Sequence, residues 1–132
     1  MKYEYANLDV LKDNWDFIKL GLNRILRKSP EPWIPEDVYA KCVYKEGFLW
    51  LIRDDQDRLN GFFILEHLGE VCHIWCAWAI EPDMLDDGMK FIEQTARDTG
   101  AKRITFDTNR AGWIKVAKQL GFIPRTWVKE LR

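Results

Sequence analysis

The stretch WAIEPDMLDD, from Trp78 to Asp87, is where the order of predicted elements could create an anion site. It reads as the end of a strand, a turn and the start of a helix, and the free N–H groups of a helix start often bind phosphate. The turn, however, carries Glu81, Asp83, Asp86 and Asp87 and no Lys or Arg. Carboxylates in a first helical turn satisfy these N–H groups themselves and match the helix dipole. We therefore expect this helix start to be capped by its own acids.

A second group, CHIWC, invites a metal interpretation. On a strand, Cys72 and Cys76 would lie about 13 Å apart by strand rise. They cannot then share one zinc ion at about 2.3 Å from each sulfur. The sequence has three Cys and two His, with no disulfide framework and no further cluster. We expect no metal site and reduced thiols, and buried strand thiols are usually inert as nucleophiles.

Basic and aromatic residues gather in TNRAGWIKVAK. One interpretation is a short amphipathic helix with Trp113, Val116, Ala117 and Leu120 facing inward. The other is a rim that binds a phosphate or a protein partner, whose cations would be Arg103, Arg110 and Lys115.

Seven Trp among 132 residues is a high number, and Trp is favoured at protein interfaces. Trp33 lies in the proline-rich turn KSPEPWIP, and Trp127 lies near the C-terminus. Together with Arg110 and Trp113, they are the predicted contacts to a protein partner.

The elements that must position these residues follow from hydrophobic periodicity. Apolar residues recur at steps of three and four from Leu8 to Ile25, which predicts a helix, and a second helix can begin at Pro35. Period-2 and continuous apolar runs then predict three strands. The three strands cover Phe48–Arg53, Arg58–Leu68 and Val71–Ala79. The next predicted helix places Leu85, Met89, Ile92 and Ala96 on one face and ends at Gly100. A strand (KRITFDT), a short helix (GWIKVAKQLG) and a last strand (FIPRTWVKEL) follow. Alternation places His73 and Trp75 on the face opposite Cys72, Ile74 and Cys76.

Composition bounds the class of protein. A length of 132 residues suits one domain spanning residues 1–132, and 47% hydrophobic residues suffice for a core. The net charge of −1 argues against a nucleic-acid binder. The longest apolar run, VCHIWCAWAI, is too short to cross a membrane, and the N-terminus lacks the apolar stretch of a signal peptide. We expect a soluble, cytoplasmic protein without membrane partners.

The predicted order, ααβββαβαβ, with NGFFIL, ARDTGAKRITFDT and KQLGFIP, resembles the GNAT superfamily of acetyl-CoA-dependent N-acyltransferases. The resemblance covers nearly the whole chain. It implies an α/β fold, a single GNAT-like domain with a mixed, mostly antiparallel sheet flanked by helices. The segments GEVCHIWCAWA, RITFDTNRAGW and TWVKEL further resemble small GNAT-like proteins encoded by tailed bacteriophages, some of which are associated with particle assembly.

The resemblance also implies where acyl-CoA would bind. GNAT enzymes pair pantetheine with backbone groups of a strand that corresponds to Ala77, Trp78 and Ala79. They hold the pyrophosphate with a loop of the pattern Arg/Gln-x-x-Gly-x-Gly/Ala, because glycines allow close approach of backbone amides. This loop falls on Ile80–Leu85, so Ile80 takes the basic position, Asp83 and Leu85 take the close-approach positions, and Met84 lies between them. Pro82 also removes one N–H donor.

The catalytic groups depart from the family pattern as well. Many GNAT enzymes carry a general-acid Tyr that would correspond to Ala117 here, and the family's Asn at the start of that helix falls on Arg110. A general base would come from Glu66, His67 or His73, near the strand that binds acyl-CoA, and we retain His73 and Glu66 as candidates.

Two functions follow. The first is a GNAT-fold protein with a degenerate pyrophosphate loop and no cofactor, which binds a protein partner such as a phage structural protein, in the host cytoplasm or the virion. The second is an active N-acyltransferase that uses acetyl-CoA to modify a protein or small-molecule amine. Neither the acceptor nor the oligomeric state follows from the sequence.

Overall fold

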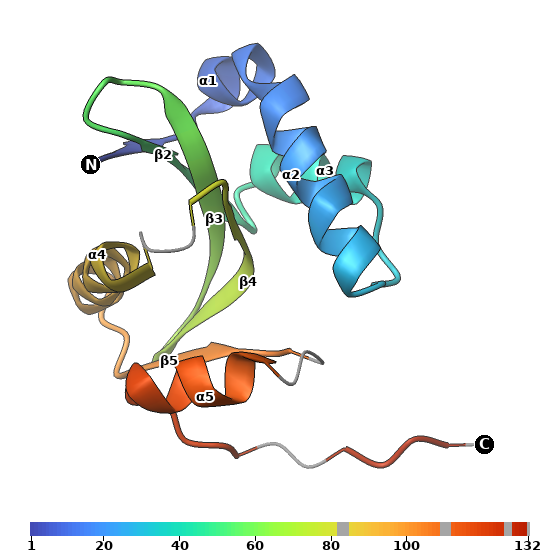
Figure 1. Cartoon of the computed structure of the whole chain (residues 1–132), viewed down its shortest axis with the longest axis vertical. Coiled ribbons are helices and arrows are strands. Elements are labelled where there is room, and N and C mark those ends of the chain that lie inside the picture. The colour runs from blue at the N-terminus through green and yellow to red at the C-terminus, as the bar shows by residue number, and fades with distance from the viewer. Residues whose placement is uncertain (82–84, 109–111, 126–127, 132) are drawn as a thin grey trace.

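A computed structural model describes residues 1–81, 85–108, 112–125 and 128–131 of the chain (Figure 1). The helices are α1 (Leu8–Asp13), α2 (Trp15–Lys28), α3 (Pro35–Val43), α4 (Leu85–Asp98) and α5 (Gly112–Gln119). The strands are β1 (Lys2–Tyr5), β2 (Phe48–Arg53), β3 (Leu59–Leu68), β4 (Val71–Ala79) and β5 (Arg103–Phe106).

The five strands form one sheet in the order β1-β2-β3-β4-β5. The first three pairings are antiparallel, and β4 pairs with β5 in parallel. A parallel pair needs a crossover connection, which α4 supplies. Helices α1, α2 and α3 lie on one side of the sheet and α4 on the other (Figure 1).

Each side of the sheet has its own hydrophobic cluster. On the side of α1 to α3, Leu11, Ile18, Leu22 and Val38 pack against Leu49, Leu51, Phe62, Ile64 and Cys76. On the side of α4, Ile92 and Ala96 pack against Ile52, Phe63, Leu65 and Cys72. The strands β2 and β3 therefore read as nearly continuous apolar runs, because both of their faces are covered.

An irregularity in the β3–β4 pairing decides which way β4 points its side chains. Ile64 pairs with Cys76 while Leu65 pairs with Ile74, so Trp75 is the extra residue of a bulge. Trp75 and Cys76 consequently both pack in the cluster on the side of α1 to α3, whereas Cys72 and Ile74 pack on the side of α4. The expected alternation was therefore wrong for Cys76, because a bulge shifts the period-2 pattern by one residue.

The expected fold class is confirmed, with differences in three elements. The first helix is divided at Asn14, whose side-chain Nδ2 donates to the Val10 carbonyl oxygen and whose backbone conformation (φ −113°, ψ 14°) interrupts the helix. The sequence analysis missed β1, which forms only by pairing with β2. The predicted last strand was wrong for the described residues 122–125 and 128–131, which are not in a strand.

Among the described residues, none of the helices combines the length and apolar character needed to cross a bilayer.

Candidate functional site

The candidate site lies where β4 and β5 diverge. Their parallel pairing runs only from Val71–Arg103 to Ile74–Phe106, although β4 continues to Ala79. Residues Cys76–Ala79 are paired with β3 on one side, and β5 does not pair with them on the other. Ala77, Trp78 and Ala79, the residues predicted to pair with acyl-CoA, thus have no β5 partner among the described residues, and their role in binding stays a prediction.

The end of β4 is held by a buried side chain, Asn60, which is 3% exposed. The Ile80 N–H donates to the backbone carbonyl oxygen of Asn60 at 2.7 Å, and the Glu81 N–H donates to the side-chain Oδ1 of Asn60 at 3.3 Å. Both backbone amides therefore already have acceptors inside the protein. A phosphate at this point would have to compete with one backbone and one side-chain oxygen of Asn60 for them, which costs both hydrogen bonds.

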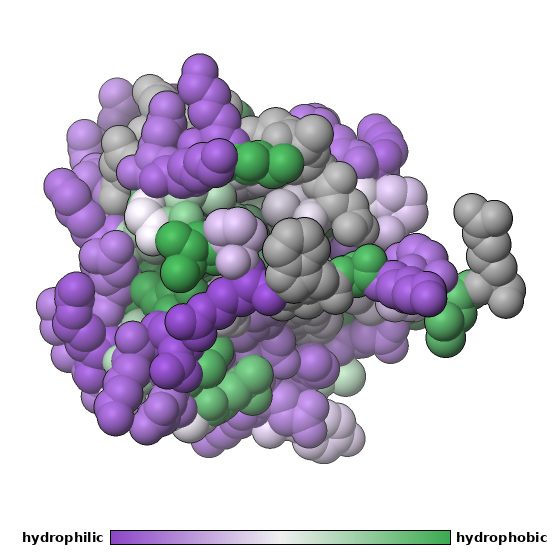
Figure 2. Space-filling view, turned by 90° about the horizontal axis from the view of Figure 1, so that it is seen from below, coloured by the Kyte–Doolittle hydropathy of each residue, from purple (hydrophilic) through white to green (hydrophobic). Residues whose placement is uncertain are grey.

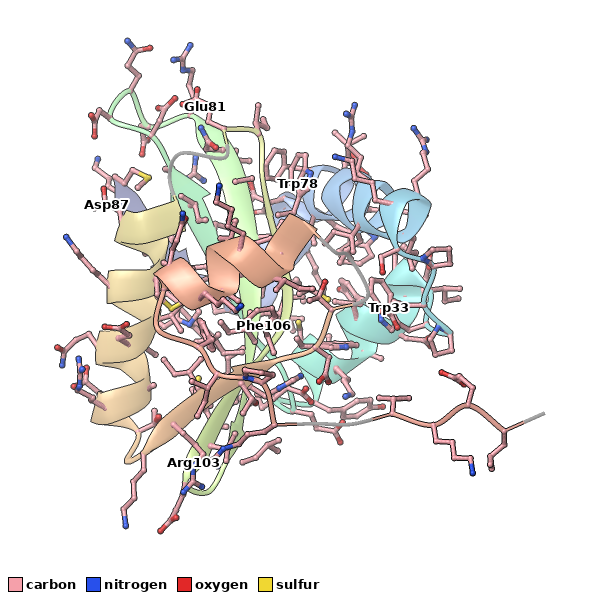
Figure 3. The ribbon with its side chains drawn as sticks, turned by 60° about the horizontal axis from the view of Figure 1, so that its bottom comes forward. Trp33, Trp78, Glu81, Asp87, Arg103 and Phe106 are labelled. Carbon is pink, nitrogen blue, oxygen red and sulfur yellow. The ribbon has the colours of Figure 1, made fainter. Side chains whose placement is uncertain are left out.

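Carboxylates stand on both sides of the junction between β4 and α4. Glu81 and Asp87 are exposed and lie toward the same end of the molecule (Figure 3). Burial and, to a smaller degree, the negative charge of Asp87 raise the pKa of the nearby Tyr3 hydroxyl. The described part of the junction is therefore electronegative, and the sequence from Val71 to Met89 contains no Lys or Arg.

The structure describes only part of the predicted phosphate loop. Asp83 and Met84 lie outside the described residues, and the side chain of Leu85 is not described. Ile80 is exposed, as its side chain has no apolar cluster to join at the end of β4. These positions remain predictions.

His73 lies at the base of the divergence. It stands opposite Thr105 in the β4–β5 pairing, and its Nδ1 is 2.7 Å from Thr105 Oγ1. Its Nε2 is 3.8 Å from Oδ2 of Asp107, whose side chain is largely exposed. Thr105 therefore orients the imidazole ring through Nδ1, while Nε2 faces the Asp107 carboxylate from beyond hydrogen-bond distance.

Glu66 is the cross-strand neighbour of His73. Its Oε2 accepts from Lys41 Nζ at 3.2 Å, and the same Nζ lies 4.4 Å from the centre of the Trp75 ring. Trp33 packs edge-on against Trp75, with ring centroids 5.8 Å apart. The structure thus brings the predicted residues Glu66, His73 and Trp33 to one face of β3 and β4, although the Glu66 carboxylate is already occupied by Lys41.

The other candidates lie elsewhere. His67 faces the side of α4, with Nδ1 3.5 Å from Thr99 Oγ1, and burial lowers its pKa. Trp78 packs its ring on Phe17 and Phe62 beneath α2, so its side chain is directed away from the β4–β5 divergence.

The cationic rim predicted near α5 is only partly described. Arg103 pairs with Val71 at the beginning of β4, and Figure 3 shows it at the opposite end of the molecule from Glu81. Its Nη1 is 4.0 Å from Glu70 Oε2. Lys115 is exposed on α5, and Trp113 packs edge-on against Phe106 with ring centroids 6.0 Å apart.

Arg110 and Trp127 lie outside the described residues. The two predicted partner contacts that are described, Trp33 and Trp113, are half-buried, with part of each ring packed against the protein.

The surroundings of the three cysteines suit a structural role for these residues. Cys72 and Cys76 are buried on opposite sides of the sheet, and burial raises the pKa of both thiols. Burial also raises the pKa of Cys42 to about 11. Within the described part of the chain, no group of three or more His, Cys, Asp or Glu side chains is placed to hold a metal ion.

Among the described residues, two surface hollows are lined mainly by residues of α1, α3 and their neighbours. The larger, about 460 Å³, is bounded by β1, α1 and the end of α3, including Tyr5, Leu11 and Cys42. The smaller, about 320 Å³, is bounded by Lys12, Trp15, Glu36 and Tyr39. Neither contains the candidate catalytic residues, so we assign the site from the strand geometry and not from the hollows.

The sequence analysis missed Asn60, Lys41, Thr105 and Asp107. A polar Asn within the apolar run LNGFFIL was a usable signal for Asn60, because a buried amide must find partners. No local signal identifies the others, since their partners come from a different element.

Comparison with solved structures shows the same fold in acetyltransferases. The chain is similar to a probable acetyltransferase (21% identity, TM-score 0.73, covering 100% of this chain and 96% of that chain). It is also similar to a ribosomal-protein-alanine N-acetyltransferase from Brucella melitensis (14% identity, TM-score 0.69, covering 100% of this chain and 99% of that chain). A third similar structure is that of the aminoglycoside N-acetyltransferase AAC(6')-Iy in complex with CoA (14% identity, TM-score 0.67, covering 99% of this chain and 98% of that chain).

At these identities, the likeness shows the GNAT fold alone. Neither the models of known protein families nor the curated proteins contain a match to the chain.

Proposed function

We propose that this protein keeps the GNAT fold but acts by binding another protein and not by acyl transfer. The observation that carries this proposal is the junction between β4 and α4. The Ile80 and Glu81 amides donate to Asn60, and the junction carries the exposed carboxylates of Glu81 and Asp87.

Two effects oppose a pyrophosphate at this junction. The Ile80 and Glu81 amides, which lead from β4 toward the predicted loop, are already hydrogen-bonded to Asn60, and the carboxylates of this acidic stretch repel the negative charge of the ligand. The expected Arg/Gln-x-x-Gly-x-Gly/Ala pattern would supply a positive charge and closely approaching amides, and IEPDML supplies neither.

The partner is a protein, as the aromatic residues of the chain suggest. Trp33 keeps part of its ring in solvent, and the neighbouring Ile34 is 56% exposed. Trp113, Arg110 and Trp127 are the further contacts that we propose. The resemblance to small phage-encoded GNAT-like proteins makes a structural protein of a phage particle, or a factor of its assembly, the partner that we propose.

Isothermal titration calorimetry with CoA and acetyl-CoA tests this function. We expect no heat of binding up to millimolar ligand. AAC(6')-Iy, whose complex with CoA has been solved, is the matched positive control in the same buffer. Saturable binding of either ligand at micromolar concentration would overturn the proposal.

An active N-acyltransferase that uses acetyl-CoA remains the second candidate, and a separate observation favours it. The β4 backbone from Trp75 to Ala79 lacks a β5 partner, and His73 is oriented at the base of the divergence by Thr105, with Asp107 3.8 Å from its Nε2. In this function His73 would accept the amine proton, with Glu66 as the alternative base. Release of free CoA with an amine or protein acceptor, lost in His73→Gln and retained in His67→Gln, would support it.

A further inference from the structure

The larger of the two surface hollows, about 460 Å³, lies outside the candidate functional site. It opens where β1 leaves the sheet. The Ala6 N–H still donates to the Leu49 carbonyl oxygen at 2.9 Å, and the chain then enters α1 at Leu8. The start of α1, the end of α3 and the start of β2 at Phe48 therefore enclose a concave space.

Exposed apolar side chains alone do not distinguish this place. Seen from below, apolar (green) residues lie in several groups among hydrophilic (purple) ones (Figure 2). Such scattered groups are ordinary on a protein surface. The hollow differs because its apolar side chains surround a concave space, and they are those of Tyr5, Leu8, Leu11, Val43 and Phe48.

The apolar walls are held by the fold but remain open to solvent. Leu11 is buried, and the Tyr5 and Phe48 rings lie with centroids 6.2 Å apart. Leu8 is 47% exposed and Val43 is 39% exposed. A hollow of this size, with mainly apolar walls and few polar groups, is typical of a site for a small molecule.

The charge of the hollow is positive. Among the described residues that line it, Lys45 alone carries a charged side chain, and its sequence neighbour Glu46 does not line it. Lys41, one turn earlier in α3, is paired with Glu66, whereas Lys45 forms no ion pair within the described part of the chain. Burial raises the pKa of Cys42 to about 11 and also raises the pKa of Tyr5, so both groups are uncharged at neutral pH.

The backbone of Lys45 is a second, independent observation. Its φ of 58° lies in the left-handed region, directly after the C-cap residue Tyr44 of α3. Glycine is the usual residue at this position of a helix end, because a Cβ is unfavourable there. The fold alone therefore favours glycine, and the lysine side chain is present at a cost in stability. A bound anion would offset that cost.

We propose that this hollow binds a small carboxylate with an apolar body, whose carboxylate pairs with Lys45 and whose body packs against Leu8, Val43 and the rings of Tyr5 and Phe48. Asn7 supplies a further donor at the same place. Its Oδ1 accepts from the Val10 N–H at 3.0 Å, so its Nδ2 is the side-chain group left to donate. None of the described residues that line the hollow belongs to β4, α4 or β5, so the proposal does not depend on whether the chain binds acyl-CoA.

Titration with octanoate, followed by the amide signals of the ¹⁵N-labelled protein, tests the site. We expect saturable shifts at Leu8, Val43, Lys45 and Phe48, with a dissociation constant on the order of 0.1–1 mM for a ligand of this size. The neutral 1-octanol and the cationic octylamine carry the same chain. Both should bind about three- to tenfold more weakly, because neither pairs with Lys45. Shifts confined to other residues, or equal binding of the three compounds, would overturn the proposal.

Two changes at Lys45 separate binding from folding. Lys45→Met keeps the apolar stem and should weaken octanoate about three- to tenfold while leaving 1-octanol unchanged. Lys45→Gly should weaken octanoate to the same extent and yet raise the midpoint of thermal unfolding, because glycine adopts the positive φ freely. Lys12→Met is the matched control, since Lys12 is exposed on α1 and lines the smaller hollow. It should change the affinity less than twofold, and an effect as large as that of Lys45→Met would contradict the assignment.

Filling the hollow tests its apolar part. Val43 is exposed at the end of α3, so Val43→Trp should keep the fold, which thermal unfolding checks, and should abolish the binding of both octanoate and 1-octanol. Unchanged octanoate binding by this variant would show that the ligand lies elsewhere. Titration with CoA reports on Ile80 to Gly88 and titration with octanoate on the residues around Lys45, so the two proposals can fail independently.

Discussion

At the scale of single residues, the candidate site is defined by which polar groups already have partners. Asn60 occupies two amides at the end of β4, and Lys41 occupies the Glu66 carboxylate. His73, the other predicted catalytic group, is oriented through Nδ1 by Thr105 of β5, and its Nε2 has no hydrogen-bond partner among the contacts of the described residues. An enzyme built on this chain would therefore depend on His73, and a binding protein would use the same contacts to stabilise the sheet.

The cysteines provide a prediction at this scale. With its pKa raised to about 11, Cys42 is ionised in roughly one molecule in a thousand at pH 8, against about a quarter for a free thiol. Alkylation of the native protein by iodoacetamide should therefore be on the order of 100-fold slower than that of free cysteine. Cys72 and Cys76 should react more slowly still, because burial both excludes the reagent and raises their pKa.

Peptide mass spectrometry over a time course measures the modification of each thiol. The same protein unfolded in guanidinium chloride is the control, in which all three should react at the rate of free cysteine. Modification of native Cys42 at that rate would show that its thiolate is stabilised and would reopen a nucleophilic role.

At the scale of elements, the site depends on how closely β3 and β4 approach. A Cβ added at Gly61 would meet the Trp78 carbonyl oxygen and lie 2.7 Å from Ala79 Cα. Both contacts are backbone atoms, so the two strands would have to separate. A Cβ added at Gly88 has no described atom within 4 Å.

The variants Gly61→Ala and Gly88→Ala form a matched pair. We expect Gly61→Ala to lower the free energy of unfolding by about 1–3 kcal/mol, as overpacking does. Gly88→Ala should raise it by roughly 0.5–1 kcal/mol, since Gly88 lies within α4 and alanine is the better helix former. Urea unfolding followed by circular dichroism measures both, and equal stabilities would contradict the close approach of β3 and β4.

The same scale shows what sequence patterns can predict. The apolar stripes of α2 and α4 and the strands β2, β3 and β4 were identified because each pattern is local and covers several residues. The bulge at Trp75 was not, because it depends on the register between β3 and β4. β1 was missed for a related reason, since its four residues are ordered by β2 and not by their own pattern.

For the last predicted strand, a local pattern predicted an element that the described residues do not form. The alternation after Phe122 favours a strand, but a strand also needs an edge that it can reach. Of the site, the location at the end of β4 and the acidic character of the junction were predicted from residue types. The roles of Asn60 and Lys41 could not be, because each contacts a segment far away in the sequence.

At the scale of the whole molecule, the fold is that of acetyltransferases, and fold does not determine function. The β4–β5 divergence that could admit a cofactor is retained, while the junction that would hold its pyrophosphate is acidic. Apolar side chains near the end of the chain, including Val128 and Leu131, are exposed.

The central claim, that the junction between β4 and α4 does not accept a pyrophosphate, is tested most directly by NMR. Backbone amide signals of the ¹⁵N-labelled protein are followed during titration with CoA to millimolar concentration. The account predicts no saturable shift for the amides from Ile80 to Gly88, and in particular none for Ile80 and Glu81, which donate to Asn60. Saturable shifts confined to these amides would contradict it.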